Sequence, residues 1–126
     1  MYMEITERTV DDVTVLALKG RIILEEEEHP LRTVVDMLVE QGRLKLVLDL
    51  REATYIDSAG VGVLVAKYVS VRRRGGTIKL LHLGPRVRHV LEITKLTGVF
   101  EIFESEDEAV RSFSRPDNAR REVLSL

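Results

Sequence analysis

Hydrophobic and polar positions along the chain follow two periods. Apolar runs rich in β-forming residues predict five strands, at residues 2–9, 13–19, 45–50, 77–83 and 99–103. Apolar positions three and four residues apart predict four helices, which begin near residues 30, 58, 85 and 105. Because strands and helices alternate after the first two strands, we expect a mixed, mainly parallel α/β sheet with an antiparallel hairpin at its N-terminal edge.

Glycine, proline and charge mark the expected ends of these elements. Gly20 is expected to stop the second strand, and Gly42 to end the first helix. The acidic run Glu25–Glu28 leads into Pro30. Both features suit the first turn of a helix, because acids complement the helix dipole there and proline lacks only an N–H that would be unpaired.

The segment 45–69 carries the strongest pattern. Lys45–Leu50 (KLVLDL) is a nearly continuous apolar run, as expected of a strand that is buried on both faces. Residues 51–57 are predicted to form a crossover loop, and a helix is predicted to begin at Ser58. The inward face of this helix should carry Val61, Leu64, Val65, Tyr68 and Val69. Ligands of open α/β sheets bind beyond the carboxyl ends of strands, which makes residues 51–58 the candidate site.

The composition limits the size and the partners of the protein. The chain has 126 residues, 44% hydrophobic and 32% charged, which fits one globular domain, expected at 1–113, with a polar tail at 114–126. A net charge of −2, without basic clusters that alternate with aromatic residues, argues against nucleic acid as a direct partner. No apolar run approaches the ~20 residues of a membrane span, and no signal segment is visible. These features and the lack of cysteine lead us to expect a cytoplasmic protein.

Catalysis by Ser58 has little support in the sequence. A nucleophile elbow has the pattern G-x-S-x-G, whereas Ile56 lies two residues before Ser58. A general base would have to be His29, His82 or His89, and no motif brings any of them to Ser58. We therefore expect a protein that is not an enzyme.

Cofactor, metal and small-molecule sites are not expected either. Gly60-Val61-Gly62 lacks the third glycine of a dinucleotide-binding loop, because Val65 stands there, and it lacks the Lys-Ser/Thr pair of a P-loop. The histidines are scattered without a partner at i, i+4, so no metal site is predicted. Asp49 and Asp57 are a conceivable acid–base pair, but their places at a strand end and in a turn favour structural roles.

Two roles remain open for Ser58. Serine is among the best helix N-caps, because its hydroxyl accepts a hydrogen bond from a free backbone N–H. Gly60 and Gly62 leave the first turn without side chains, so that another protein can approach the turn and an enzyme can reach Ser58. A phosphate would add about −1.5 to −2 charges, which the helix dipole favours and the carboxylate of Asp57 opposes. The two roles are compatible, since a free hydroxyl can cap the unmodified helix.

The segment LVLDLREATYIDSAGVGVLVAKYVSVRRRGGTIKLLHL resembles the STAS domain of anti-sigma factor antagonists. The resemblance rests on the apolar strand, the block Thr54–Gly62 with its D-S-A-G-V-G motif, the helix, and Gly75-Gly76 before a buried strand. It extends over roughly residues 10–113. It implies a mixed sheet with helices packed mainly on one side.

The resemblance also implies a function, which is partner switching. The serine that aligns with Ser58 is phosphorylated by a serine kinase that is also the anti-sigma factor. The unphosphorylated antagonist binds this kinase, phosphorylation breaks the complex, and a phosphatase resets it. The partner is expected to contact Asp57, Ser58, Ala59, Gly60, Val61 and Gly62. ATP would be bound by the kinase, and no cofactor by this chain.

One position departs from the family pattern. Many members carry aspartate after the second strand, in a G-x-L-D pattern, where this chain has Ile23 after Gly20. The acidic run Glu25–Glu28 is a candidate substitute. The departure supports an alternative function, in which a STAS scaffold or transporter-associated module docks an ATPase partner without a phosphorylation switch.

Overall fold

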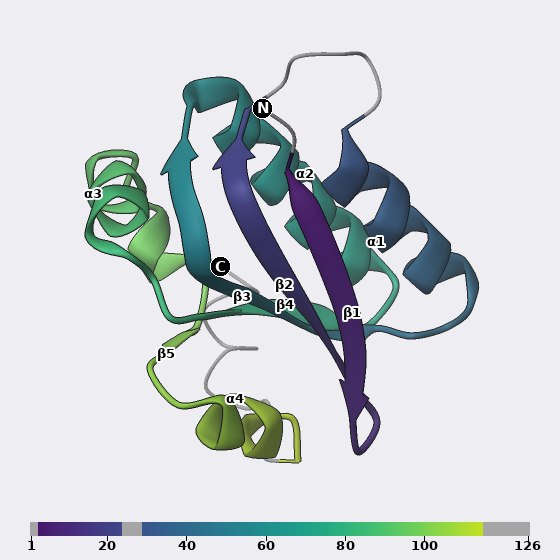
Figure 1. Ribbon diagram of the computed structural model, residues 1–126. Helices are drawn as coiled ribbons and strands as arrows, with labels where there is room; N and C mark the ends of the chain where they lie inside the picture. The colour runs from purple at the N-terminus through teal and green to yellow at the C-terminus, as the bar shows by residue number, and fades with distance from the viewer. Residues whose placement is uncertain (1–2, 24–28, 115–126) are drawn as a thin grey trace.

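The computed structural model describes residues 3–23 and 29–114 and contains one mixed sheet with helices around it (Figure 1). The strands are β1 (Glu4–Val10), β2 (Val13–Ile22), β3 (Lys45–Ile56), β4 (Thr77–Leu81) and β5 (Ile102–Phe103). The helices are α1 (Pro30–Glu40), α2 (Ser58–Arg73), α3 (Pro85–Ile93), the 3-10 turn η1 (Leu96–Gly98) and α4 (Glu106–Ser112). The acidic run Glu25–Glu28 and the tail residues 115–126 lie outside the described residues.

The five strands lie in the order β1-β2-β3-β4-β5. β1 is antiparallel to β2, and every later pair is parallel. The mainly parallel sheet with an antiparallel N-terminal edge is therefore confirmed. Strands β2 to β5 follow one another across the sheet in one direction. Right-handed crossovers between such strands place all the connecting helices on the same face of the sheet.

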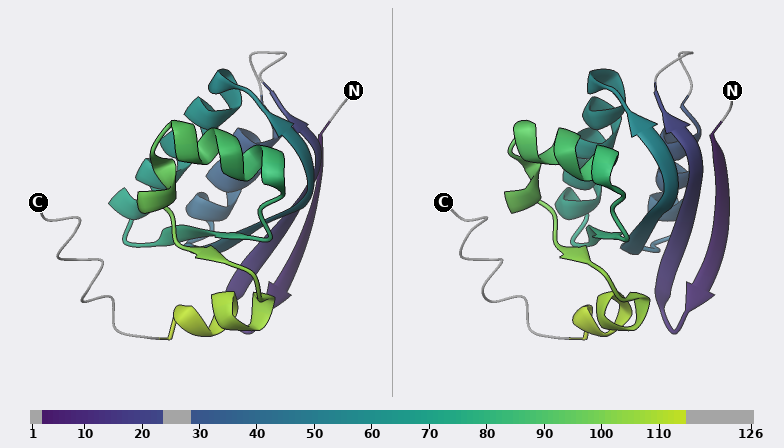
Figure 2. Two further views of the ribbon diagram at one scale, coloured as in Figure 1. Left: turned by 90° about the vertical axis from the view of Figure 1, so that its left-hand side faces the viewer. Right: turned by 60° about the vertical axis from the view of Figure 1, so that its left-hand side comes forward.

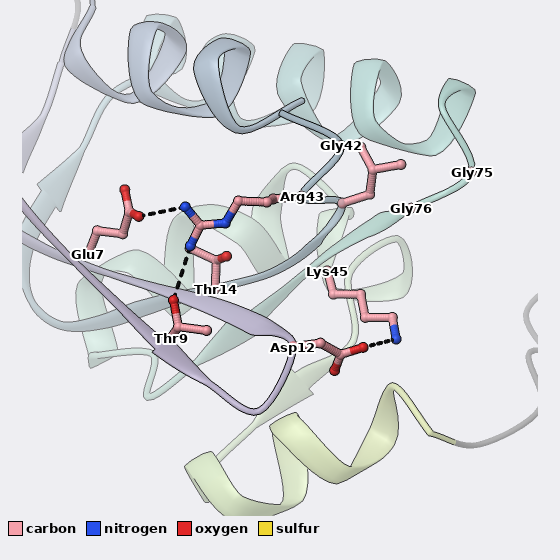
Figure 3. A pocket seen from close by; sticks show the side chains of 10 residues that line it. Glu7, Thr9, Asp12, Thr14, Gly42, Arg43, Lys45, Gly75 and Gly76 are labelled. Carbon is pink, nitrogen blue, oxygen red and sulfur yellow. Dashed lines mark hydrogen bonds and ion pairs between the residues drawn. The ribbon is translucent and has the colours of Figure 1, made fainter. Parts of the chain in front are cut away.

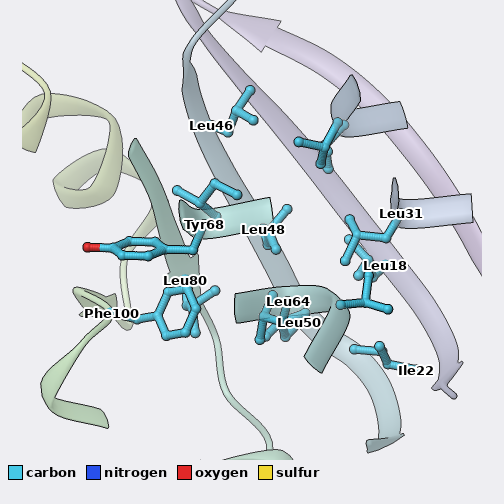
Figure 4. Close-up of a cluster of buried hydrophobic side chains, with 14 of the residues drawn as sticks. Leu18, Ile22, Leu31, Leu46, Leu48, Leu50, Leu64, Tyr68, Leu80 and Phe100 are labelled. Atoms are coloured by element: carbon cyan, nitrogen blue, oxygen red, sulfur yellow. The ribbon is translucent and has the colours of Figure 1, made fainter. Parts of the chain in front are cut away.

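The side chains follow this arrangement, because successive residues of a strand point to opposite faces. Leu46, Leu48 and Leu50 of β3 are fully buried in the core cluster beneath α1, α2 and α3, together with Leu64 of α2 (Figure 4). Val47 points the other way and packs, with Ala109 and Val110 of α4, in a second cluster. The prediction that this run is buried on both faces is confirmed.

Three helices therefore cover one face of the sheet, and α4 covers part of the other. Figure 2 shows α4 apart from the other helices, at the end of the molecule where β1 turns into β2. An ion pair between Arg8 of β1 and Glu106 of α4 lies at the same end. Among the described residues, no helix is long and apolar enough to cross a membrane.

Several element boundaries differ from those predicted. Gly20 does not stop β2, because its positive φ of 108° is accommodated within the strand, which runs on to Ile22. Residues 51–56 are not a crossover loop, because they pair with this extension of β2 and continue β3. Val69 does not face the core and is 40% exposed, because the buried face of α2 continues from Tyr68 to Val71. The last strand is shorter than expected, because η1 precedes it.

The predicted helix ends are otherwise close to those in the structure. Pro30 begins α1, and Gly42 with a φ of 75° follows its end. Ser105 caps α4 by accepting a hydrogen bond from the Glu108 N–H. Serine followed by glutamate three residues later is the spacing of a capping box, and this local signal is present in the sequence.

Candidate functional site

The start of α2 lies beyond the carboxyl ends of β2 and β3. Strand β3 carries one extra residue relative to β2 at two places. The first lies opposite Leu18. The second is Thr54, because Gly20 pairs with Ala53 but Arg21 pairs with Tyr55. Extra residues of this kind bend a strand and redirect its side chains, and they are frequent beside functional sites. β3 is thereby carried past the end of β4 and into α2.

Asp57, rather than Ser58, is the N-cap of α2. Its backbone is extended (φ −105°, ψ 179°), and its carboxylate accepts a hydrogen bond of 2.7 Å from the Gly60 N–H. Its carbonyl accepts the first helical bond, from the Val61 N–H at 2.9 Å. The interpretation of Ser58 as the cap is therefore wrong by one residue. Aspartate caps as well as serine does, so the residue whose backbone is still extended takes the role.

Ser58 is the first residue of α2 and is exposed. Within the described part of the chain, its hydroxyl makes no hydrogen bond. Because the Asp57 carboxylate already accepts the Gly60 N–H, the hydroxyl of Ser58 is not needed as the N-cap of α2. It is available to another molecule.

The two glycines of the first turn have different surroundings. Gly60 is buried, and a Cβ atom there would lie closer than 3.0 Å to the Ile22 carbonyl group. Gly60 therefore allows α2 to contact the backbone of β2 within this chain. Gly62 is exposed, and a Cβ atom there would meet nothing within 4 Å. Only Gly62 leaves bare surface at the helix start.

The six residues predicted to contact a partner thus fall into three groups. Ser58 and Gly62 are exposed, Asp57 and Ala59 are half-buried, and Gly60 and Val61 are buried. Exposed residues can touch a partner directly. The buried ones can act only by holding the shape of the turn.

The histidines do not form a catalytic pair with Ser58. His29 is buried and caps α1, because its Nδ1 accepts a hydrogen bond of 3.1 Å from the Leu31 N–H. His82 Nε2 lies 2.7 Å from the Arg51 guanidinium, and His89 is exposed on α3. No group of three or more potential metal ligands occurs among the residues that the structure describes.

The pKa of His29 lies below its ordinary value of 6.5. The main cause is burial, which disfavours the charged ring, and the positive charge of Arg32 acts in the same direction. A hydrogen bond to the Ile23 backbone and the carboxylate of Asp57 oppose this lowering. His29 therefore links the end of β2 to the start of α1.

Two arginines near this site are not indicated by the sequence pattern. The guanidinium groups of Arg21 and Arg86 lie 5.4 Å and 5.6 Å from the centre of the Tyr55 ring. The pairing of Arg21 with Tyr55 depends on the extra residue in β3, and Arg86 comes from α3. No local pattern in the sequence signals this convergence.

A groove of about 710 Å³ lies at the other end of β3 (Figure 3). Its cations are already bound within the chain. Arg43 contacts Glu7 at 2.9 Å and Thr9 at 3.1 Å, and Lys45 contacts Asp12 at 2.5 Å. The groove lies at the start of β3 and contains none of the predicted site residues, so it is separate from the start of α2.

Comparison with known proteins identifies relatives over nearly the whole described chain. The profile of the STAS domain matches residues 4–109. The "Anti-sigma-B factor antagonist" of Listeria monocytogenes is 32% identical over 106 residues, which cover 84% of this chain and 91% of that protein.

Solved structures show the same architecture. The crystal structure of tm1081 from Thermotoga maritima superimposes with a TM-score of 0.81 at 28% identity, and covers 88% of this chain and 95% of that one. The Bacillus cell fate determinant SpoIIAA in its phosphorylated form has a TM-score of 0.68 at 21% identity, and covers 87% of this chain and 99% of that one. At that identity the second likeness concerns the fold alone.

Proposed function

Because this chain belongs to the STAS domain family, we propose that it is an anti-sigma factor antagonist whose partner docks at the start of α2 and is released when Ser58 is phosphorylated. The observation that carries the proposal is the exposed hydroxyl of Ser58, which has no hydrogen-bond partner among the described residues. Asp57 caps the helix in its place, so Ser58 can be modified without loss of the N-cap.

A phosphate on Ser58 would change the docking surface more than it changes the fold. The positive end of the helix dipole stabilises the added charge. The carboxylate of Asp57 and any acidic group of a docked partner repel it, and like charges brought together at an interface cost several kcal/mol. Gly62 keeps the surface beside Ser58 free of side chains, so a partner backbone can come close.

The partner of this proposal is an anti-sigma factor that is also a serine kinase. The kinase binds the ATP, so this chain needs no cofactor, and a phosphatase restores the unmodified serine. All three act in the cytoplasm. The proposed domain comprises residues 1–113, followed by a polar tail at 114–126.

The test compares Ser58→Ala and Ser58→Asp as baits in a lysate of the source organism. Ala66→Asp is the matched control, because Ala66 is exposed on the same helix but far from its start. We expect Ser58→Ala and the control to capture one kinase-type ATPase, and Ser58→Asp to capture at least about tenfold less of it, equivalent to ~1.4 kcal/mol. The captured ATPase and ATP should then add phosphate to Ser58 of the wild-type chain, as measured by mass spectrometry.

The same experiment addresses docking without a switch. That alternative is favoured by Ile23, which stands where many family members carry aspartate. If both Ser58 variants capture the same ATPase equally and Ser58 receives no phosphate, the switch is wrong and the docking module remains.

A further inference from the structure

Three side chains from separate elements meet beside the start of α2. Arg21 lies near the end of β2, Tyr55 near the end of β3, and Arg86 in the first turn of α3. Both guanidinium groups lie over the Tyr55 ring, at 5.4 Å and 5.6 Å from its centre. We call Arg21, Tyr55 and Arg86 the arginine–tyrosine cluster. Tyr55 is three residues before Ser58, so the cluster borders the proposed docking site.

Neither arginine of the cluster has an acidic partner within the described residues. Asp57, the nearest acid to Tyr55 in the sequence, directs its carboxylate to the Gly60 N–H. Elsewhere, carboxylates bind Arg43, Lys67 and Arg88. Within residues 3–23 and 29–114, two exposed positive charges at the carboxyl edge of the sheet thus have no acidic partner.

The Tyr55 ring also limits the motion of both guanidinium groups. A cation over an aromatic face is attracted by the ring, and arginine keeps its hydrogen-bond donors free at the edge of its plane while it stacks. Side chains that are held in place before binding lose less conformational entropy when they bind. The cluster therefore presents two oriented forks, each able to bind a carboxylate through two N–H groups.

We propose that the arginine–tyrosine cluster binds an acidic segment of the protein that docks at the start of α2. The identity of that protein rests on the proposed function, whereas the preference for carboxylates rests on the cluster alone. Nucleic acid fits less well, because the net charge of −2 opposes a polyphosphate chain. The proposal also explains why phosphorylation weakens binding. A phosphate on Ser58 is negatively charged, like the acidic segment that the cluster attracts, and therefore repels that segment.

The test uses a capped hexaglutamate peptide and the full-length chain labelled with ¹⁵N. Addition of the peptide should shift the amide resonances of Arg21, Tyr55 and Arg86, and a capped hexaglutamine peptide should not. Arg21→Gln/Arg86→Gln should weaken hexaglutamate binding about fivefold, as expected for two exposed ion pairs. Arg73→Gln/Arg74→Gln is the matched control, because it removes two exposed arginines at the other end of α2.

The outcomes separate this proposal from the proposed function. Equal weakening by the two double variants, or shifts that do not include the cluster, would overturn carboxylate recognition by the cluster. The amide spectrum of each variant shows whether it is folded before any titration. Ser58 takes no part in this experiment, so loss of the switch in the Ser58 baits leaves its result unchanged, and failure here leaves the switch untouched.

Discussion

Gly60 and Gly62 lie two residues apart in α2, yet they have opposite structural requirements. Gly60 lies against the backbone of β2, where a side chain has no room, and Gly62 faces open space. Helix propensity favours alanine over glycine by up to ~1 kcal/mol when nothing else intervenes. The cost of Gly60 is offset by close packing, whereas the cost of Gly62 has no compensation among the residues that the structure describes.

Matched substitutions measure this difference. Gly60→Ala should lower the free energy of unfolding by about 3 kcal/mol, because the new Cβ forces α2 away from the Ile22 carbonyl group. Gly62→Ala should raise it by up to ~1 kcal/mol. Urea denaturation of both variants provides the measurement. Equal effects of the two substitutions would contradict the structural difference, and weaker capture of the partner by Gly62→Ala would show that the bare surface serves docking.

His29 predicts a pH dependence of stability. Its pKa is lower in the folded protein than its ordinary value of 6.5, mainly because the ring is buried. The unfolded chain therefore binds a proton first as the pH falls. Stability should be fully present above about pH 6.5 and decrease below it, by at most ~1.4 kcal/mol per pH unit for one group.

The control for this prediction is His29→Asn, which keeps an N-cap for α1 but does not titrate. Thermal unfolding of both proteins between pH 7.5 and 5 should show a steeper loss for the wild type. Parallel curves would assign the pH dependence to groups other than His29.

At the scale of elements, α4 is held to the sheet by a buried lysine. Lys79 of β4 is 6% exposed, and its Nζ lies 2.8 Å from Glu101 and 2.7 Å from the Ser112 hydroxyl. The ammonium group also lies 4.2 Å from the centre of the Phe113 ring. An ionic contact, a hydrogen bond and a cation–π contact thus join β4 to the last helix.

Lys79→Ala should destabilise the protein by about 2–3 kcal/mol, because it removes these contacts and leaves a cavity. Lys79→Met fills the space but still removes the contacts with Glu101 and Ser112, so it should cost less than the alanine variant, about 1–2 kcal/mol. Urea denaturation measures the stability of the whole protein, and amide hydrogen exchange in α4 shows whether this helix alone is released from the sheet. Similar effects of the two variants would assign the stabilisation to the charge rather than to the packing.

Elements with a strong local pattern could be predicted from the sequence, and those that depend on distant partners could not. The apolar run Lys45–Leu50 and the capping box at Ser105 carry their own signals. Residues 51–56 contain polar side chains and become a strand only through the extension of β2 beyond Gly20. The change of cap from Ser58 to Asp57 is also of this kind, because two adjacent residues cap equally well and backbone geometry decides between them.

At the scale of the whole molecule, the two ends of the sheet differ in how their charges are used. At the amino end of β3, Arg43 and Lys45 are bound to acids of the β1–β2 hairpin. At the carboxyl end, and within the described ranges, Arg21 and Arg86 have no acidic partner and the hydroxyl of Ser58 makes no hydrogen bond. Polar groups that the chain satisfies internally stabilise it, whereas unsatisfied exposed groups are available to a partner. This asymmetry supports the proposal that the partner docks at the carboxyl end.

Docking at that end predicts protection from hydrogen exchange on one side of the molecule only. In the complex with the ATPase captured by Ser58→Ala, amides at residues 54–62 should exchange more slowly than in the free chain. Asp57 accepts hydrogen bonds from the N–H groups of Gly60 and Val61, whereas those of Ser58 and Ala59 come before the first helical hydrogen bond, so they exchange rapidly unless a partner covers them. Amides at residues 43–45, in the groove of Figure 3, should exchange at the same rate in both states.

Lys45→Gln is the matched control and should leave capture unchanged, because Lys45 lies at the opposite end of β3 from Ser58. Protection of residues 43–45 without protection of 54–62 would place the partner on the groove and contradict docking at the start of α2.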